Sequence, residues 1–327
     1  MKAIIIDEAL PDRPLRYTDV PEPMYGKYDL LIGVKAAALN RADLRRAATH
    51  FAASDIKISL PVAGLEMAGE VVALGSHVSG YAVGDRVMAM AGGAYAEQTV
   101  IDYRLALPVP SSMTWDEAAA TPITFVTAHD ALMNAASFKK GESVFVQGAS
   151  SGAGIASVQI ARLKGATHVF GTAGSPNKLE RLRTLGCDVP INYHREDFVA
   201  VIREHTQSRG VDIVIDLVGS HTAQGNVDAT AICGRIVCVG RVAGAEATMN
   251  LDEFSRKRIR MTGVTFRTRS MEERIAAVRS FRDDVLPALE EGAIRPVIDS
   301  VYSLREAAVA QERLRANQHF GKIILKV

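Results

Sequence analysis

The stretch SVFVQGASSGAG, residues 143–154, decides the fold of the central part of the chain. Its first half is a run of apolar residues that predicts a buried strand, and its second half is a loop of small residues that opens a helix over 152–164. Small residues let a backbone approach a pyrophosphate, whose charge is favoured at the amino terminus of a helix. The strand–loop–helix context strengthens a glycine-rich signal that is weak alone, and a tight turn without a ligand is the alternative.

Strands and helices alternate outward from this stretch. Further strands are expected over 167–172, 190–192, 211–216 and 235–239, with a second helix over 176–185. Apolar strands that alternate with helices indicate a parallel sheet covered on both faces. The sequence therefore predicts an α/β, doubly wound domain over 123–268, which a helix over 123–137 opens.

The flanking parts of the chain have a different pattern. The first hundred residues hold short apolar runs, irregularly spaced between Gly and Pro turns, which is typical of a barrel or sandwich. After residue 268, an apolar stripe predicts a helix packed on a core. The last segment, 322–327, is expected to be a strand that returns to the first part. The prediction is a discontinuous domain over 1–122 and 269–327. The stripe comprises Ile275, Val278, Phe281, Val285 and Leu289.

Composition excludes several classes of protein. The 327 residues are 48% hydrophobic with a net charge of +1, so we expect two folded domains and no nucleic-acid partner. Three cysteines favour a reducing compartment over a disulfide framework, and Cys233 and Cys238 are expected to be buried. We find no signal peptide and no apolar run near the ~20 residues that span a bilayer, so we expect a cytoplasmic protein without membrane contact.

The end of the second predicted strand bears on the choice of dinucleotide. An NAD site usually has an acidic residue about 20 residues past the first glycine, to hold the ribose 2′-hydroxyl. Residues 170–175, FGTAGS, contain none, which permits a 2′-phosphate. Ser175 can donate a hydrogen bond, Lys178 supplies a charge, and Tyr193 could close over the adenosine phosphate. These residues favour NADP(H), with a solvated helix lysine as the alternative for Lys178.

At this point the motifs together resemble a known family, the quinone oxidoreductase (zeta-crystallin-like) branch of the medium-chain dehydrogenase/reductase superfamily. The resemblance covers nearly the whole chain. It implies a GroES-like β-rich domain with an inserted Rossmann domain, a cleft between them that holds NADPH, and a homodimer through the edge strand near 259–266. Its landmarks are LNRADL at 39–44, GLEMAGEV at 64–71, GDRV at 84–87, GAYAE at 93–97, the glycine loop, INY at 191–193, TG at 262–263 and GKIIL at 321–325.

Departures from the family's pattern bear on the chemistry. Ser151 replaces the middle glycine of the loop, and Phe51 stands where members often have tyrosine, so it can wall a pocket but cannot donate a proton. Zinc-dependent relatives carry Gly-His-Glu where Gly64, Leu65 and Glu66 stand here, so leucine replaces their histidine ligand. Alanines at 36–38 stand where their cysteine is expected. We therefore expect no metal, and we expect Glu66 to be structural and paired with an arginine.

The resemblance also carries over candidate site residues. The candidate catalytic residues are Asn40 for positioning, Phe51 for the pocket wall and Thr127 near the nicotinamide. The alternatives are that Asn40 caps a helix from Arg41 and that Thr127 is a packed helix residue. Arg267 lies in a segment that resembles one bordering the nicotinamide, with a solvated or interfacial arginine as the alternative. The candidate cofactor contacts are Gly148, Ser150, Ser151, Gly152, Ala153, Gly154, Thr172, Gly174, Ser175, Lys178, Tyr193, Val218, Gly240, Phe266, Arg267 and Asn317.

The expected chemistry follows from the absence of zinc ligands. A saturated carbonyl needs a Lewis acid, whereas a conjugated acceptor takes a hydride with hydrogen bonds to its developing oxyanion. The expected function is NADPH-dependent reduction of a small-molecule quinone or α,β-unsaturated carbonyl. Two alternatives stay open: an enoyl-thioester (acyl-CoA type) reductase, and a non-catalytic NADPH-binding sensor or structural protein.

Overall fold

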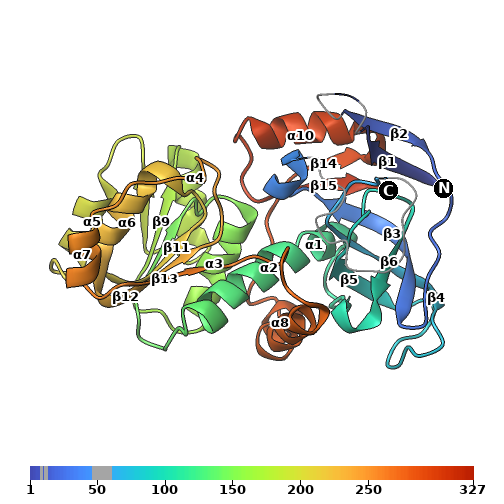
Figure 1. Ribbon diagram of the computed structural model, residues 1–327, viewed down its shortest axis with the longest axis horizontal. Coiled ribbons are helices and arrows are strands. Elements are labelled where there is room, and N and C mark those ends of the chain that lie inside the picture. The colour runs from blue at the N-terminus through green and yellow to red at the C-terminus, as the bar shows by residue number, and fades with distance from the viewer. Residues whose placement is uncertain (8–9, 11–13, 46–60) are drawn as a thin grey trace. The chain divides into compact units, whose positions relative to one another are not determined.

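The computed structural model describes residues 1–7, 10, 14–45 and 61–327. The chain forms two compact units, of which the first comprises residues 1–126 and 266–327 and the second residues 127–265. The divisions predicted from the sequence, after residues 122 and 268, lie close to these limits. Both chain termini belong to the first unit (Figure 1).

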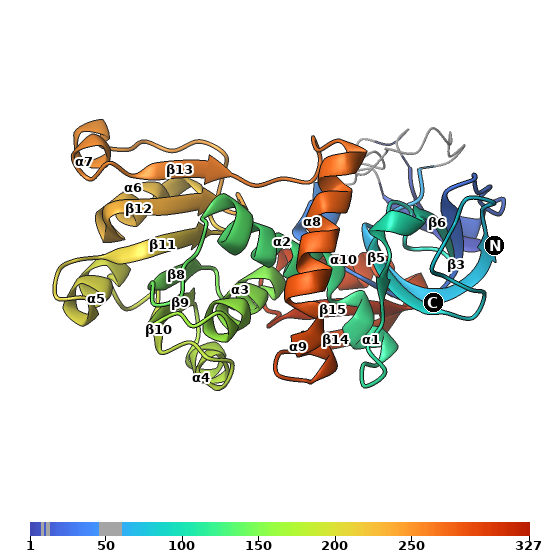
Figure 2. The same ribbon diagram turned by 90° about the horizontal axis from the view of Figure 1, so that it is seen from below.

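The second unit contains a parallel sheet of six strands in the order β10-β9-β8-β11-β12-β13, which Figure 2 shows. The first strand of this sheet, β8, lies in the middle, because the chain adds two strands on one side and then three on the other. The doubly wound prediction is confirmed, and the order reverses between β8 and β11, where such sheets bind ligands. The strands are β8 (Val144–Gln147), β9 (Val169–Ala173), β10 (Val189–Asn192), β11 (Val211–Asp216), β12 (Thr230–Cys238) and β13 (Arg260–Gly263).

Helices cover this sheet and bury its apolar side chains. Phe145, Phe170 and Val214, on three different strands, are wholly buried in the core of the unit. Burial of such side chains contributes about 1.5–3 kcal/mol each. The helices are α3 (Gly152–Leu163), α4 (Pro176–Thr184), α5 (Phe198–His205), α6 (Ala223–Ala229) and α7 (Leu251–Arg256), with a short 3-10 turn η4 (Ser220–Thr222).

Two boundaries of the second unit differ from the prediction. Strand β12 begins at Thr230 instead of residue 235, because the chain bulges at Cys233, whose φ is +61°, and the register with β11 shifts there. The helix expected over 123–137 is α2 (Pro122–His129), followed by a π-helical segment, η3 (Asp130–Ala135). Cys233, at this bulge, is exposed and Cys238 is half-buried, so the prediction that both are buried is wrong.

The first unit is built on a sheet in the order β14-β15-β3-β4-β5-β7, with β6 on β3 and a separate pair β1-β2. The predicted return of the last strand is confirmed, because β15 pairs antiparallel with β3, and Figure 1 shows these elements side by side. The strands are β1 (Lys2–Ile6), β2 (Leu15–Asp19), β3 (Asp29–Ala38), β4 (Glu66–Leu74), β5 (Arg86–Met90), β6 (Gln98–Asp102), β7 (Leu107–Pro108), β14 (Ile298–Ser303) and β15 (Lys322–Lys326).

The helices of the first unit include the predicted apolar stripe. Ile275, Val278 and Phe281 on α8 and Val285 and Leu289 after it are all buried, as expected. None of the helices in the described parts of the chain has both the length and the apolar character needed to cross a bilayer. The elements are α1 (Trp115–Ala119), α8 (Met271–Asp284), α9 (Leu286–Glu290), α10 (Ala307–Arg315), and 3-10 turns η1 (Arg41–Arg45), η2 (Tyr103–Leu105) and η5 (Leu304–Glu306).

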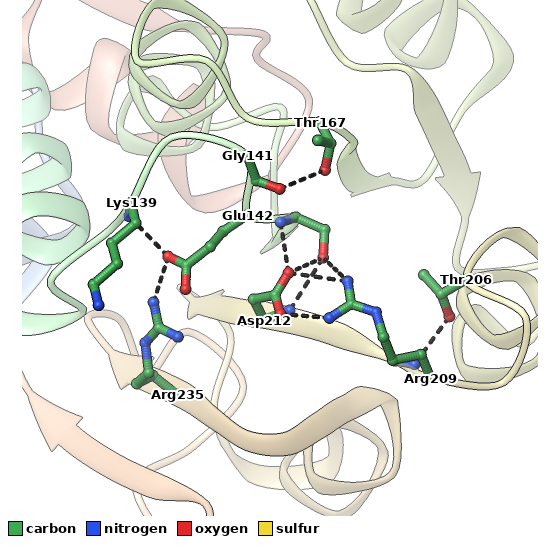
Figure 3. Close-up of polar contacts among 10 residues, drawn as sticks. Lys139, Gly141, Glu142, Thr167, Thr206, Arg209, Asp212 and Arg235 are labelled. Atoms are coloured by element: carbon green, nitrogen blue, oxygen red, sulfur yellow. Dashed lines mark hydrogen bonds and ion pairs between the residues drawn. The ribbon is translucent and has the colours of Figure 1, made fainter.

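A polar cluster joins the amino ends of β8 and β11 (Figure 3). The Asp212 carboxylate accepts from the backbone N–H and hydroxyl of Ser143 at 2.8 and 2.7 Å, and from both Nη atoms of Arg209 at 2.6 and 3.0 Å. Arg235 donates to Glu142 at 2.6 Å beside it. Burial opposes ionisation of Asp212, but the hydrogen bonds from Arg209 and Ser143 outweigh it and lower its pKa to about 2. We call Ser143, Arg209 and Asp212 the amino-edge cluster.

Candidate functional site

The glycine loop lies at the carboxyl end of β8. Gly148 has a φ of +73°, which favours glycine. Ser151 caps α3: its hydroxyl accepts from the Gly154 N–H at 3.1 Å and donates to the Gly148 carbonyl at 2.9 Å. A Cβ on Gly154 would lie 2.4 Å from the Gly148 oxygen, so the helix packs directly against the loop. This arrangement brings the amino terminus of a twelve-residue helix to the loop, as in sites that bind phosphate groups.

The candidates on β9 and β10 lie at the same edge of the sheet. Ser175 caps α4, accepting from the Lys178 N–H at 3.5 Å, and Lys178 is half-buried. A Cβ on Gly174 would lie 2.5 Å from the Tyr193 hydroxyl, so Gly174 and Tyr193 are in close contact. The Tyr193 side chain is 54% exposed, with its ring beside that of His194 at 4.4 Å between centroids. These contacts place the Lys178 backbone beside Ser175 and the Tyr193 side chain beside Gly174, and the 170–175 segment holds no acidic residue.

The candidate residues that follow β11 and β12, Val218 and Gly240, lie at the same edge of the sheet. A Cβ on Gly148 would lie 3.4 Å from Val218 Cγ2, so the loop after β11 lies beside the glycine loop. Gly240 approaches the backbone of Leu217, where a Cβ would lie 2.3 Å from the carbonyl oxygen. The structure thus brings candidates from five strands to the carboxyl edge of one sheet.

A chain of buried hydrogen bonds lies beneath these loops, and sequence reasoning missed most of its members. Thr172 links the Gly148 N–H to Gln147, Gln147 bonds to Asn226, and Asn226 bonds to Asp216. All four side chains are at most 3% exposed. Burial raises the pKa of Asp216 although it accepts several hydrogen bonds. One signal was available: Gln147 and Asp216 are polar residues at the carboxyl ends of strands in which most other residues are apolar.

In the first unit, Asn40 belongs to a buried ionic cluster. Lys322 Nζ, 4% exposed, donates to Glu66 Oε1 at 2.6 Å and to Asn40 Oδ1 at 2.8 Å. Asn40 Nδ2 donates to Glu66 Oε1 at 2.9 Å and to the Ala38 carbonyl at 3.3 Å. The expected arginine partner of Glu66 is wrong, since the partner is Lys322, and the other carboxylate oxygen of Glu66 accepts from the Ile123 N–H at 2.7 Å.

A second buried carboxyl adjoins Asn40. Asp43 accepts from the Asn40 backbone N–H at 2.7 Å and from the Tyr95 hydroxyl at 3.0 Å. Burial raises the pKa of Asp43 to about 7, because these hydrogen bonds compensate only part of the desolvation. Asn40 is thus held through both its side chain and its backbone.

The remaining candidates are dispersed along the chain. Phe51 lies outside the described residues. Thr127 is a half-buried residue of α2, and Phe266 is buried with the Arg269 guanidinium 4.6 Å above its ring centre, while Arg267 lies in the following turn. Asn317 is exposed, has a φ of +57° and accepts from Arg41.

Known proteins share this architecture. Residues 26–111 match the alcohol dehydrogenase GroES-like domain family, and residues 152–281 match a family described as zinc-binding dehydrogenase. The chain is 31% identical to a quinone oxidoreductase of Lama guanicoe, over 99% of this chain and 97% of the relative. The chain belongs to the medium-chain dehydrogenase/reductase family, in its quinone oxidoreductase-like branch. It is therefore an oxidoreductase of a family that binds nicotinamide dinucleotides, with a GroES-like domain and a Rossmann-type sheet.

Other members of this family fit the same picture. The chain is 36% identical to prostaglandin reductase-3 of Bos taurus over 71% of its own length, and spans 60% of that protein. Two solved structures align with the whole chain: a mycobacterial protein complexed with NADPH (TM-score 0.88, 26% identity) and an NAD-dependent alcohol dehydrogenase (TM-score 0.86, 30% identity). Each structure is covered over its full length. This fold is therefore shared by a protein that binds NADPH and by one that is NAD-dependent.

The family's zinc has no evident ligand set in the described residues. No group of three or more His, Cys, Asp or Glu side chains there could hold a metal ion. Glu66, the acidic residue of the motif that includes a zinc ligand in other members, is bonded to Lys322 and Asn40. The three cysteines all lie in the second unit.

Proposed function

We propose that the protein is an NADPH-dependent reductase that transfers a hydride to a quinone or an α,β-unsaturated carbonyl without a metal. The observation that carries the cofactor choice is the end of β9, where Ser175 caps α4 next to Lys178 and the 170–175 segment holds no acid. A carboxylate there would repel a 2′-phosphate, whereas a hydroxyl and an ammonium attract one.

The second unit fits a dinucleotide on physical grounds. The positive φ of Gly148 and the contact of Gly154 with the loop backbone leave no side chain between the loop and the amino terminus of α3. The pyrophosphate belongs there, because the helix terminus favours negative charge. Tyr193 would cover the adenosine phosphate, and Val218 and Gly240 border the same edge. When bound, the nicotinamide supplies the hydride.

We propose that the side-chain amide of Asn40 donates a hydrogen bond to the oxygen of the hydride acceptor. The hydrogen bond from Asn40 Nδ2 to the Ala38 carbonyl, 3.3 Å long, is longer than the 2.9 Å bond from the same nitrogen to Glu66, so this amide hydrogen is the one that an incoming oxygen can take over. Lys322 and Glu66 hold the rest of the amide in place. Because the phenyl ring of Phe51 has no proton to give, the proton that completes the reduction comes from water or another side chain.

The test compares NADPH and NADH oxidation with a benzoquinone, a cyclic enone and crotonyl-CoA. We expect turnover with NADPH preferred, and the Ser175→Asp variant should lower the NADPH-to-NADH ratio of kcat/KM by about tenfold or more through charge repulsion. Ser175→Asn is the matched control, since asparagine also caps helices but carries no charge.

Each outcome of this comparison has a defined meaning. Equal use of NADH and NADPH by the wild type would contradict the cofactor assignment. Turnover of crotonyl-CoA alone would favour the enoyl-thioester alternative. Tight NADPH binding without turnover of any acceptor would favour a sensor or structural protein and contradict the reductase.

We also propose a homodimer through β13. This strand ends the sheet, and all four of its residues are exposed, so its outer edge presents backbone groups that a second strand can pair. Light scattering after size-exclusion chromatography should give twice the mass of the chain, and Thr262→Pro should give a monomer. A monomeric wild type would contradict the proposal.

A further inference from the structure

We propose that Asp216 and the buried hydrogen bonds that lead to it position the glycine loop and the loop after β11 as one unit, and so set the affinity for the dinucleotide. This inference rests on the proposed cofactor site. The relay consists of Thr172, Gln147, Asn226 and Asp216, and these four are positioning residues. Thr172, predicted from the family resemblance as a cofactor contact, is 1% exposed and hydrogen-bonded within the relay, so we assign it to positioning and not to contact with the cofactor.

The relay runs across three strands without a break. The Gly148 N–H donates to Thr172 Oγ1 at 2.9 Å, and the Thr172 hydroxyl donates to Gln147 Oε1 at 2.9 Å. Gln147 Nε2 donates to Asn226 Oδ1 at 3.1 Å, and Asn226 Nδ2 donates to Asp216 Oδ2 at 3.0 Å. Every one of these distances is that of a well-formed hydrogen bond.

The two ends of the relay fix its direction. A backbone N–H can only donate, and an ionised carboxylate can only accept. Between these ends, both side-chain amides must turn their oxygens toward Gly148 and their nitrogens toward Asp216. Successive bonds that point the same way polarise one another, so a change at one end is felt at the other.

The carboxylate also holds the second loop. Asp216 Oδ1 accepts from the Val218 N–H at 2.8 Å and the Gly219 N–H at 2.9 Å. Val218 in turn lies beside the glycine loop, since a Cβ on Gly148 would lie 3.4 Å from its Cγ2. One carboxylate therefore anchors both loops that border the switch point of the sheet.

A lysine anchors the helix that supplies Asn226. Lys257 Nζ donates to the carbonyls of Val227, Asp228 and Thr230, each at 2.9 Å, at the end of α6. A cation at the carboxyl terminus of a helix is stabilising. This contact fixes the position of α6, and with it the amide that connects the two halves of the relay.

Burial makes the relay costly to interrupt. An unpaired polar group without access to water costs more free energy than a hydrogen bond contributes. A Thr172→Val change keeps the shape but leaves the Gly148 N–H without this acceptor and Gln147 without this donor. The Gly148 backbone can then regain an acceptor only by moving, which changes the loop that binds the pyrophosphate.

The experiment is a double-mutant cycle on NADPH affinity, read by the fluorescence of bound NADPH, with Thr172→Val, Asp216→Asn and both together. We expect each single change to raise Kd on the order of tenfold. The fold-increase in Kd of the double variant should be well below the product of the two single fold-increases, because either change alone already breaks the same relay. KM for NADPH should rise while kcat changes little, since no relay residue touches the reacting atoms.

Matched variants separate positioning from general destabilisation. Thr172→Ser keeps the hydroxyl and should bind NADPH within about twofold of the wild type. Asp212→Asn, on the same strand but in the amino-edge cluster, should lower the melting temperature without changing Kd. If Asp216→Asn does not fold, Asn226→Leu takes its place in the cycle.

Two results would overturn the inference, and they differ from failure of the proposed function. Single variants that bind like the wild type, or effects that multiply within about twofold, would show that the residues act independently. A wild type that binds neither NADPH nor NADH would remove the proposed function itself, and the inference with it.

Discussion

Strand β11 carries one aspartate near each of its ends, and the pKa values of the two carboxyl groups are shifted in opposite directions. Asp212, at the amino edge, is bonded to the charged Arg209, and its pKa is lowered to about 2. Asp216, at the carboxyl edge, accepts from the neutral N–H groups of Val218, Gly219 and Asn226, and burial raises its pKa. The amino edge thus stabilises the fold through an ion pair. At the carboxyl edge, the burial of Asp216 has a free-energy cost, and its carboxylate holds two loops in place.

Substitution of one glycine at each edge of the sheet should give the largest difference in NADPH affinity between the two edges. A Gly154→Val variant should lose NADPH affinity by about a hundredfold or more, because its Cβ would lie 2.4 Å from the Gly148 oxygen and push the loop away from α3. Gly141→Ala is the control at the amino edge, where nothing lies within 4 Å of a Cβ but φ is +94°. It should cost about 1 kcal/mol of stability and leave Kd unchanged. Unchanged NADPH binding by Gly154→Val would contradict the assignment of the cofactor site to the carboxyl edge.

Removing the Asp212 charge should have an intermediate effect. Asp212→Asn is expected to lower the free energy of unfolding by about 1 kcal/mol after allowance for solvent screening. A folded-state pKa below the unfolded value of 3.8 means that the ionised carboxylate stabilises the fold. That contribution is fully present above the unfolded value and is lost as the pH falls toward about 2. Denaturant titrations of both proteins should therefore converge in acid, and a constant difference down to pH ~2 would contradict the assignment.

The smallest expected effect belongs to the neighbouring ion pair. Arg235 and Glu142 form a partly exposed bridge at 2.6 Å, to which the Lys139 N–H adds a bond at 2.8 Å. Glu142→Gln should lower stability by about 0.5–1 kcal/mol, measured by denaturant unfolding, since such pairs are worth little. A change in NADPH affinity with this variant would show that the amino edge also influences the cofactor site, and would blur the distinction between the two edges.

Local sequence patterns predicted most of the second unit. Residues 211–216, VDIVID, are strongly apolar apart from Asp212 and Asp216, and form β11 over the predicted range. The glycine loop was predicted because it depends on neighbours along the chain, namely small residues between a strand and a helix. The cap that Ser175 forms on α4 was not predicted, although serine is a common residue at that position.

Long-range partners could not be predicted in the same way. Lys322 and Glu66 are far apart in the sequence, and only the pairing of β15 with β3 and of β3 with β4 brings them into contact. Asn226 lies in a helix with polar neighbours, QGNVDA, where nothing marks it as buried. Cys233 is exposed because the chain bulges, and a bulge depends on the register of two strands.

Hydrogen–deuterium exchange with and without NADPH tests the central claim most directly, namely that the carboxyl edge of the sheet binds the cofactor and the amino edge does not. The account predicts slower exchange on NADPH binding at residues 148–154, 174–178, 218–219 and 240. It predicts unchanged exchange at 139–143 and 209–212. Protection confined to the amino edge, or no protection at residues 148–154 in protein saturated with NADPH, would contradict it.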